Sequence, residues 1–183
     1  MGPNFGIANQ SCVASGGYIA CVGGVTSSGV TSAVYYGPLA SSGGVTSWTK
    51  SQNSYPTPIT DQSCVASGGD IYCVGGSTGS GYLPTSATYY ATFDSSGVGS
   101  WTATTPYGSS PTPIEEQSCV AGLGGNAIVC VGGNTGTNVT SAVNYATFSG
   151  LGIGSWAASA LYPTLIEEQS CFANAIGVTA YCV

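Results

Sequence analysis

Positive charge is almost absent from this sequence of 183 residues. It has a single basic residue, Lys50, no histidine and no arginine, against seven acidic residues. Without histidine there is no imidazole to act as a base or to bind a metal ion. Without arginine there is no bidentate group for phosphate or carboxylate, and one lysine offers no electrostatic surface to nucleic acid or anionic lipid. We therefore expect no nucleic acid among the partners.

Long hydrophobic runs are also missing. No stretch reaches the roughly 18 apolar residues of a transmembrane helix, so no membrane insertion is expected. Hydrophobic residues nevertheless make up 43% of the chain, in short runs separated by many of its 29 glycines. A disordered chain would lack such runs. Short apolar segments between Gly- and Pro-rich turns predict an all-β fold.

One five-residue string recurs along the chain. QSCVA occupies residues 10–14, 62–66 and 117–121, and the variant QSCFA occupies 169–173. From cysteine to cysteine the intervals are 52, 55 and 52 residues (12 to 64, 64 to 119, 119 to 171). A period near fifty is typical of repeat architectures, in which similar units stack on one another. We expect one repeat domain over 1–183, with repeats at about 8–59, 60–114 and 115–166 and an incomplete repeat at 167–183.

The eight cysteines form four local pairs with odd separations. The pairs are Cys12 with Cys21, Cys64 with Cys73, Cys119 with Cys130, and Cys171 with Cys182, which are 9, 9, 11 and 11 residues apart. Directly opposed residues of an antiparallel hairpin with an even loop have odd separations. The first three hairpins would then turn at two-residue Gly-Gly loops, at 16–17, 68–69 and 124–125, and the fourth at 176–177.

Opposed cysteines at a non-hydrogen-bonded position are close enough to form a disulfide. We therefore predict one cross-strand disulfide in each repeat. Buried free thiols and a metal site are the alternatives, although the short C-x-x-C spacing of metal sites is missing. Structural disulfides persist outside the reducing cytosol, so the predicted location is extracellular or at the cell surface.

Each complete repeat is predicted to hold four strands. In the first repeat they span 10–14, 18–22, 31–36 and 45–49. The second strand ends in Gly-Gly, the third carries a tyrosine, and a tryptophan follows about eleven to twelve residues later. This pattern resembles the kelch repeat over nearly the whole chain. The resemblance implies a β-propeller with blades of four antiparallel strands, about three and a half repeats here, and with the tyrosines and tryptophans packed between blades.

The chain departs from the kelch pattern in three ways. Paired cysteines are not part of the general pattern, and glutamine replaces the His or Arg that often precedes the first-strand serine in intracellular kelch adaptors. Kelch-type copper oxidases need histidine, and sialidase-like propellers need arginine, so we expect no enzyme.

The third departure is the number of repeats. Three and a half repeats do not close a propeller, which needs about four to eight blades. A fragment, a seven-bladed ring shared by two chains, and an open stack forming a filament all remain as explanations.

Acidic residues recur just before the QSC motif. They are Asp61, Glu115, Glu116, Glu167 and Glu168, with Asn9 at the same place in the first repeat. In a kelch-type propeller this loop lies near the mouth of the central channel, so the resemblance implies a partial ring of acids. Such a rim could bind a hard cation such as Ca²⁺ or another ligand, act in acid–base chemistry, or be a solvated surface. No other cofactor is expected.

Two N-x-S/T sequons begin at Asn9 and Asn138, and Asn138 lies in the better exposed predicted loop. Together these features predict a non-catalytic, extracellular structural or adhesive protein, glycosylated and part of a larger surface assembly or filament. Its partners would be copies of itself, other surface proteins or glycans. The alternatives are a carbohydrate- or protein-binding propeller module and, third, a fragment of a secreted enzyme.

Overall fold

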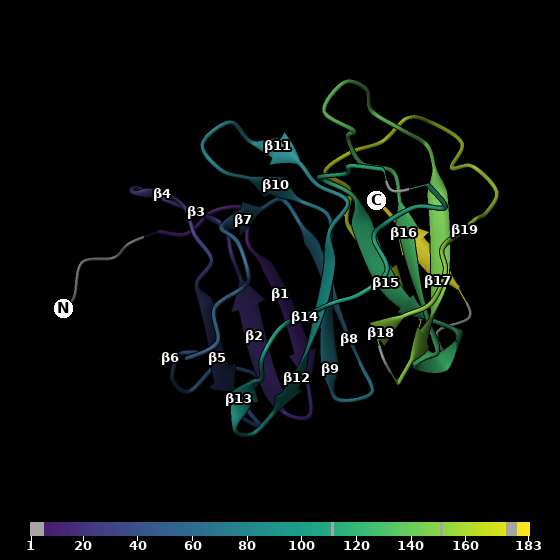
Figure 1. Ribbon diagram of the computed structural model, residues 1–183. Helices are drawn as coiled ribbons and strands as arrows, with labels where there is room; N and C mark the ends of the chain where they lie inside the picture. Colours follow the sequence, from purple (N-terminus) through teal and green to yellow (C-terminus); the bar gives the residue numbers. More distant parts are fainter. Residues whose placement is uncertain (1–5, 111, 151, 175–178) are drawn as a thin grey trace.

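The computed structural model of the chain describes residues 6–110, 112–150, 152–174 and 179–183 (Figure 1). Within these residues the regular structure consists of strands, apart from one 3-10 turn, η1 (Leu123–Gly125). The strands form three successive antiparallel sheets and a hairpin, one for each predicted repeat, and each of these sheets is small and open among the described strands. The all-β class is therefore confirmed. The described part of the chain holds no helix with the length and hydropathy of a membrane span.

The first sheet has the strand order β1-β2-β5-β6. These strands are β1 (Ser11–Ser15), β2 (Tyr18–Val22), β5 (Val34–Pro38) and β6 (Thr49–Lys50). The second sheet has the order β8-β9-β12-β13, with β14 also paired to β12. Its members are β8 (Ser63–Ser67), β9 (Asp70–Val74), β12 (Thr88–Asp94), β13 (Gly97–Val98) and β14 (Thr102–Ala103).

The third sheet repeats this plan in the order β15-β16-β17-β18, with β19 also paired to β17. It contains β15 (Ser118–Gly122), β16 (Ala127–Val131), β17 (Val143–Ser149), β18 (Gly152–Ile153) and β19 (Ala157–Ala158). The terminal hairpin consists of β20 (Cys171–Ala173) and β21 (Ala180–Cys182). The first strands β1, β8, β15 and β20 lie beside one another in that order.

Short strands connect the sheets at the end where the first strands begin. One pair is β3 (Val25–Thr26) with β4 (Gly29–Val30). A second group, in the order β11-β10-β7, consists of β7 (Ile59–Thr60), β10 (Ser77–Thr78) and β11 (Leu83–Pro84). Because β7 belongs to the first repeat and β10 to the second, this small sheet joins two repeats at that end (Figure 1).

All four predicted disulfides are present, and no cysteine of the chain is free. In each hairpin the two cysteines are directly opposed, as in the pairing of Cys64 with Cys73 on β8 and β9. The Cα atoms of each pair are 4.0 to 4.1 Å apart, which is the short spacing of opposed residues without a hydrogen bond between them. The register that odd separations predicted is therefore the register of the structure.

The predicted two-residue Gly-Gly turns are found in the first two hairpins. Gly68 and Gly69 connect β8 to β9 with φ angles of 63° and 89°, which glycine adopts without steric cost. The prediction for the third hairpin is wrong in loop length. Pairing ends at Gly122 and Ala127, so four residues that include η1 form the connection. The predicted turn of the fourth hairpin, 176–177, lies outside the described residues.

Two predicted strand boundaries of the first repeat are also wrong. The third strand begins at Val34 instead of residue 31, because the Oγ1 of Thr31 accepts a hydrogen bond from the amide of Ala33 and turns the chain there. The fourth strand, expected at 45–49, is reduced to β6 and an isolated bridge between Leu39 and Val45. In the second and third repeats the fourth strand is split into two short strands that pair with the same neighbour.

Apolar side chains fill the space between neighbouring sheets. Val22 and Val34 of the first sheet share one buried cluster with Ile71 and Phe93 of the second. A second cluster joins the second and third sheets in the same way. Burial of these faces is the main stabilising interaction between repeats, since no sheet can cover its own apolar face.

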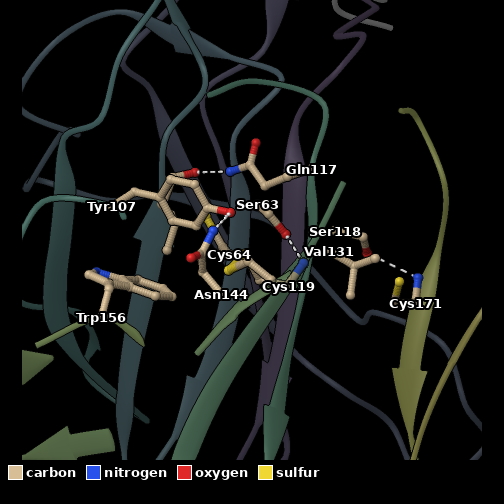
Figure 2. The surroundings of a disulfide bond; sticks show 12 residues. Ser63, Cys64, Tyr107, Gln117, Ser118, Cys119, Val131, Asn144, Trp156 and Cys171 are labelled. Atoms are coloured by element: carbon tan, nitrogen blue, oxygen red, sulfur yellow. Dashed lines mark hydrogen bonds between the residues drawn. A yellow bond between two sulfur atoms is a disulfide. The ribbon is translucent and has the colours of Figure 1, made fainter. Parts of the chain in front are cut away.

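Aromatic residues cross each of these two boundaries. Tyr55, which ends the first repeat, meets the edge of Trp101 at a centroid distance of 4.9 Å. Tyr107 meets Trp156 in the same way at 5.0 Å, and the two rings are seen together in Figure 2. Trp48 was also expected to pack between repeats, but it is 51% exposed. Trp101, which is partly buried, and Trp156, which is buried, each pack on a tyrosine from the preceding repeat, and no described tyrosine stands in that place for Trp48.

Candidate functional site

One residue before each QSC motif has a left-handed backbone. These residues are Asn9, Asp61, Glu116 and Glu168, with φ between 54° and 58°. Among the other described non-glycine residues only Tyr82 has a positive φ. Asn and Asp tolerate this conformation better than Glu, for which it carries a local steric cost. The same unfavourable conformation in every repeat indicates that the surrounding structure imposes it.

The left-handed residues are joined to one another by backbone hydrogen bonds. The amide of Asp61 donates to the carbonyl of Asn9 over 3.2 Å, and Glu116 donates to Asp61 over 3.0 Å. Glu168 donates to Glu116 over 3.0 Å. The four residues therefore form an arc with one member from each repeat.

The glutamine of each QSC motif reaches back to the repeat before it. The Nε2 of Gln62 donates to the carbonyl of Val22 over 2.7 Å, and the Nε2 of Gln117 donates to that of Val74 over 2.7 Å. Gln169 makes the equivalent bond to Val131. Each glutamine thus links the start of one sheet to the end of the second strand of its neighbour.

The serine of the motif links its repeat to the following one. Its Oγ accepts a hydrogen bond of 2.9 to 3.0 Å from the cysteine amide of the following repeat. The amides of Cys64, Cys119 and Cys171 donate to Ser11, Ser63 and Ser118 respectively. Figure 2 shows the second and third of these bonds. The Gln-Ser pair is therefore the joint between repeats. Sequence reasoning missed this role, although the recurrence of both letters before each cysteine was a usable signal.

The arc of left-handed residues and the glutamines beside it surround an open hollow of about 340 Å³. We call it the oxygen-lined hollow, and its lining is Asn9, Gln10, Asp61, Gln62, Glu116, Gln117, Glu168 and Gln169. The structure thus brings together three of the five acids that the sequence predicted for a rim.

The other two predicted rim acids are placed differently. Glu115 does not line the oxygen-lined hollow, because its backbone pairs with that of Asn134 through hydrogen bonds of 2.8 and 2.9 Å. The Oε2 of Glu167 accepts a hydrogen bond of 2.8 Å from the Nδ2 of the same asparagine. Of the predicted rim acids, the structure places in the oxygen-lined hollow the one immediately before the glutamine in the second, third and fourth repeats, and Asn9 takes this place in the first.

Negative charge in the oxygen-lined hollow is not neutralised by the chain's single basic residue. Burial, together with the charges of Glu115, Glu167, Glu168 and Asp61, raises the pKa of Glu116 to about 7. Burial, Asp61 and Glu167 also raise the pKa of Glu115. Lys50 lies exposed on β6 and is not among the groups that perturb either carboxyl. The hollow therefore favours protons or other cations.

The two predicted glycosylation sites differ in their surroundings. Asn138 is exposed in the loop between β16 and β17, where its Nδ2 donates to the neighbouring Thr137 Oγ1 over 3.1 Å. Asn9 belongs to the lining of the oxygen-lined hollow, and its carbonyl accepts the bond from Asp61. Glycosylation at either position remains a prediction.

Comparison with known proteins supports the fold alone. No family model matches the chain, and no curated protein matches it in sequence. A solved structure described as "Structure of YjhT" superimposes on 94% of this chain with a TM-score of 0.74 and 16% sequence identity. The chain spans 58% of the length of that structure. At this identity the similarity indicates a shared arrangement of strands and carries no activity with it.

Proposed function

We propose that this chain is a non-catalytic structural or adhesive repeat protein that works outside the cell, as kelch-like propeller blades within a larger surface assembly or filament. The four intramolecular disulfides support an oxidising environment. Sparse charge supports self-association, since a weakly charged surface does little to keep molecules apart.

The propeller arrangement is supported by the relation between repeats. The sheets pack face to face, their first strands lie side by side, and one joint of Gln and Ser recurs between them. Blades of a propeller meet in this manner around a central axis.

The observation that carries the assembly proposal is an uncovered aromatic face on the terminal hairpin. Phe172 and Tyr181 stack at a centroid distance of 5.3 Å and are 55% and 50% exposed. The equivalent residues of the second sheet, Val65 and Tyr72, are 6% and 3% exposed because the third sheet covers them. We infer that a sheet of another copy covers this face in the assembly.

The opposite side of the fold offers a matching surface. Trp48 of the first sheet lacks the tyrosine that Trp101 and Trp156 receive from their neighbours. Tyr162 occupies the place of Tyr55 and Tyr107, with the same backbone bond from its amide to a serine carbonyl, and is only half-buried. A head-to-tail contact between copies would place the first sheet of one chain, which carries Trp48, over the terminal hairpin of the next. Such contacts either close into a ring or continue as a filament.

The test is the oligomeric state of the purified chain over a range of concentrations, by light scattering and electron microscopy. We expect rings or filaments, and we expect Trp48→Ala and Phe172→Ala each to shift the population toward monomers. Tyr82→Ala is the matched control, since Tyr82 is 49% exposed on a loop away from both faces. A chain that stays monomeric at every concentration, or assembles equally well in all variants, contradicts the proposal.

A second candidate is a carbohydrate-binding module. The carboxylates and carboxamides of the oxygen-lined hollow are groups that hydrogen-bond sugar hydroxyls, and the hollow is open to solvent. Specific and saturable binding on a glycan array, lost in Asp61→Ala, would favour this function over a purely structural one.

A further inference from the structure

Each joint between repeats has a donor side and an acceptor side. The later repeat supplies three donors, namely the amide of the left-handed residue, the Nε2 of the glutamine and the amide of the cysteine. The earlier repeat supplies three acceptors, namely the carbonyl of its own left-handed residue, the carbonyl that follows its second cysteine, and the serine Oγ. The same three bonds recur at the next two joints, whose serine bonds are seen in Figure 2. The joint is therefore a directional contact with a fixed register.

The first repeat presents the donor side of such a joint, and no repeat of the described chain covers it. We call this surface the donor end, and its donors are the amides of Asn9 and Cys12 and the Nε2 of Gln10. Cys12 is opposed to Cys21 at a position without a hydrogen bond between them, so its amide points away from β2. Gln10 and Cys12 are exposed, whereas the glutamines and cysteines at these positions in the next two repeats are 5% to 7% exposed. The donor end therefore has the groups of a joint without the cover that a joint provides.

The terminal hairpin presents the acceptor side, and no described repeat covers it either. We call this surface the acceptor end, and its acceptors are the carbonyls of Glu168 and Val183 and the Oγ of Ser170. The carbonyl of Val183 accepts one hydrogen bond, from the amide of Ser170 over 3.0 Å, and a carbonyl oxygen has a second lone pair. Ser170 is exposed, whereas the serine at its position in each earlier repeat is half-buried. The uncovered rings of Phe172 and Tyr181 belong to the same end.

We propose that the donor end of one copy docks on the acceptor end of a second copy in the register of the internal joints. The three bonds of this contact run from the Asn9 amide to the Glu168 carbonyl, from the Gln10 Nε2 to the Val183 carbonyl, and from the Cys12 amide to the Ser170 Oγ. This inference rests on the proposed assembly and specifies its contact.

A second copy is the partner that fits, because both halves of the contact belong to this chain. The donors at one end match the acceptors at the other in kind, number and order, and the chain forms the same contact within itself at three joints. Charge is also compatible. The left-handed residue of the donor end is the neutral Asn9, so docking places no further acid beside Glu168. Because the two ends differ, the contact is heterologous and each copy keeps one end free for the next.

The experiment blocks one end at a time and then mixes the two blocked chains. Ala14 lies exposed on the same face of β1 as Cys12, and Phe172 is 55% exposed on the acceptor end, so an arginine at either position should leave the fold intact by circular dichroism. Ala14→Arg and Phe172→Arg should each stay monomeric in sedimentation velocity at concentrations where the native chain assembles. An equimolar mixture retains one native end of each kind, so it should form two-chain complexes and grow no further. Tyr82→Arg, on an exposed loop, is the control and should assemble like the native chain.

The register is tested in the same mixture. Gln10→Ala, placed in the Phe172→Arg chain, should weaken the two-chain complex about fivefold through loss of one hydrogen bond. Gln52→Ala is the matched control, since Gln52 is exposed on the connection after β6, outside the donor end. If the native chain assembles but the mixture stays monomeric, or if Gln10→Ala leaves the affinity unchanged, this inference is overturned and the proposed function stands. A native chain that is monomeric at every concentration would overturn both.

Discussion

Removing the disulfide of the second repeat should cost more stability than removing that of the first. Cys12–Cys21 and Cys64–Cys73 have the same sequence separation of 9 and therefore close loops of equal length. In the chain-entropy model, a loop of about ten residues contributes about 2.7 kcal/mol at 25 °C. This contribution is the same for both disulfides, because it arises from the unfolded chain.

The two disulfides differ in how their sulfur atoms are packed. Cys64 and Cys73 are 7% and 0% exposed and belong to the cluster between the first and second sheets. Cys12 is exposed, and only Cys21 of that pair is buried. Loss of one buried sulfur leaves a small cavity worth about 1 kcal/mol. The variant C64A/C73A should therefore lose about 5 kcal/mol, and C12A/C21A about 4 kcal/mol.

The assay is equilibrium unfolding in urea, followed by tryptophan fluorescence, with both double variants and the native chain under identical conditions. The difference between the variants tests packing, since the loop contribution cancels. Equal losses would show that the buried sulfurs add nothing beyond the constraint on the unfolded chain. A greater loss in C12A/C21A would refute the reasoning altogether.

Two further predictions concern the joints between repeats. Gly68 and Gly75 have φ angles of 63° and 62°, but a Cβ on Gly68 would meet open space while one on Gly75 would overlap the carbonyl oxygen of Ile114. Gly68→Ala should therefore cost about 1 kcal/mol and Gly75→Ala at least about 3 kcal/mol in urea unfolding, and similar losses would contradict the close approach of Gly75 to the segment that leads into the third repeat. The free energy of unfolding should also fall as the pH rises from about 4.5 to about 7. Folding raises the pKa of Glu116 to about 7, so over this pH range the folded state retains a proton that the unfolded chain has released. Solvent screening reduces this effect to about 1 kcal/mol. In unfolding curves recorded at several pH values, Glu116→Gln should flatten the dependence of the free energy of unfolding on pH. An unchanged dependence would assign the effect to other groups.

The parts of the fold that were predicted correctly depend on local geometry. The pairing of Cys64 with Cys73 follows from an odd separation and a Gly-Gly turn, both of which are visible in ten consecutive residues. An odd separation between paired cysteines is compatible with a two-residue loop and with a four-residue loop. For that reason the third connection, which contains η1, was predicted with the right cysteine register and the wrong length.

The candidate site was predicted in part. The recurrence of acids before QSC indicated where the site lies. It did not indicate which of two consecutive acids, Glu115 or Glu116, lines the oxygen-lined hollow. The left-handed backbone of Glu116 places it in the oxygen-lined hollow, and the pairing of Glu115 with Asn134 keeps that residue outside. Hydrogen bonds to other repeats impose this backbone conformation. These bonds cannot be predicted from the residues next to Glu116 in the sequence.

The recurring unit, the four disulfides and the all-β class follow from the order of residues alone, because hairpin register and turn chemistry act over a few residues. How the repeats meet depends on long-range packing. The bonds of Gln117 to Val74 and of Cys119 to Ser63 join residues 43 and 56 positions apart, and they form only when apolar faces have brought the sheets together. Burial of those faces, which depends on the whole chain, therefore creates the oxygen-lined hollow. The sequence shows how many acids there are, but not which of them line this hollow.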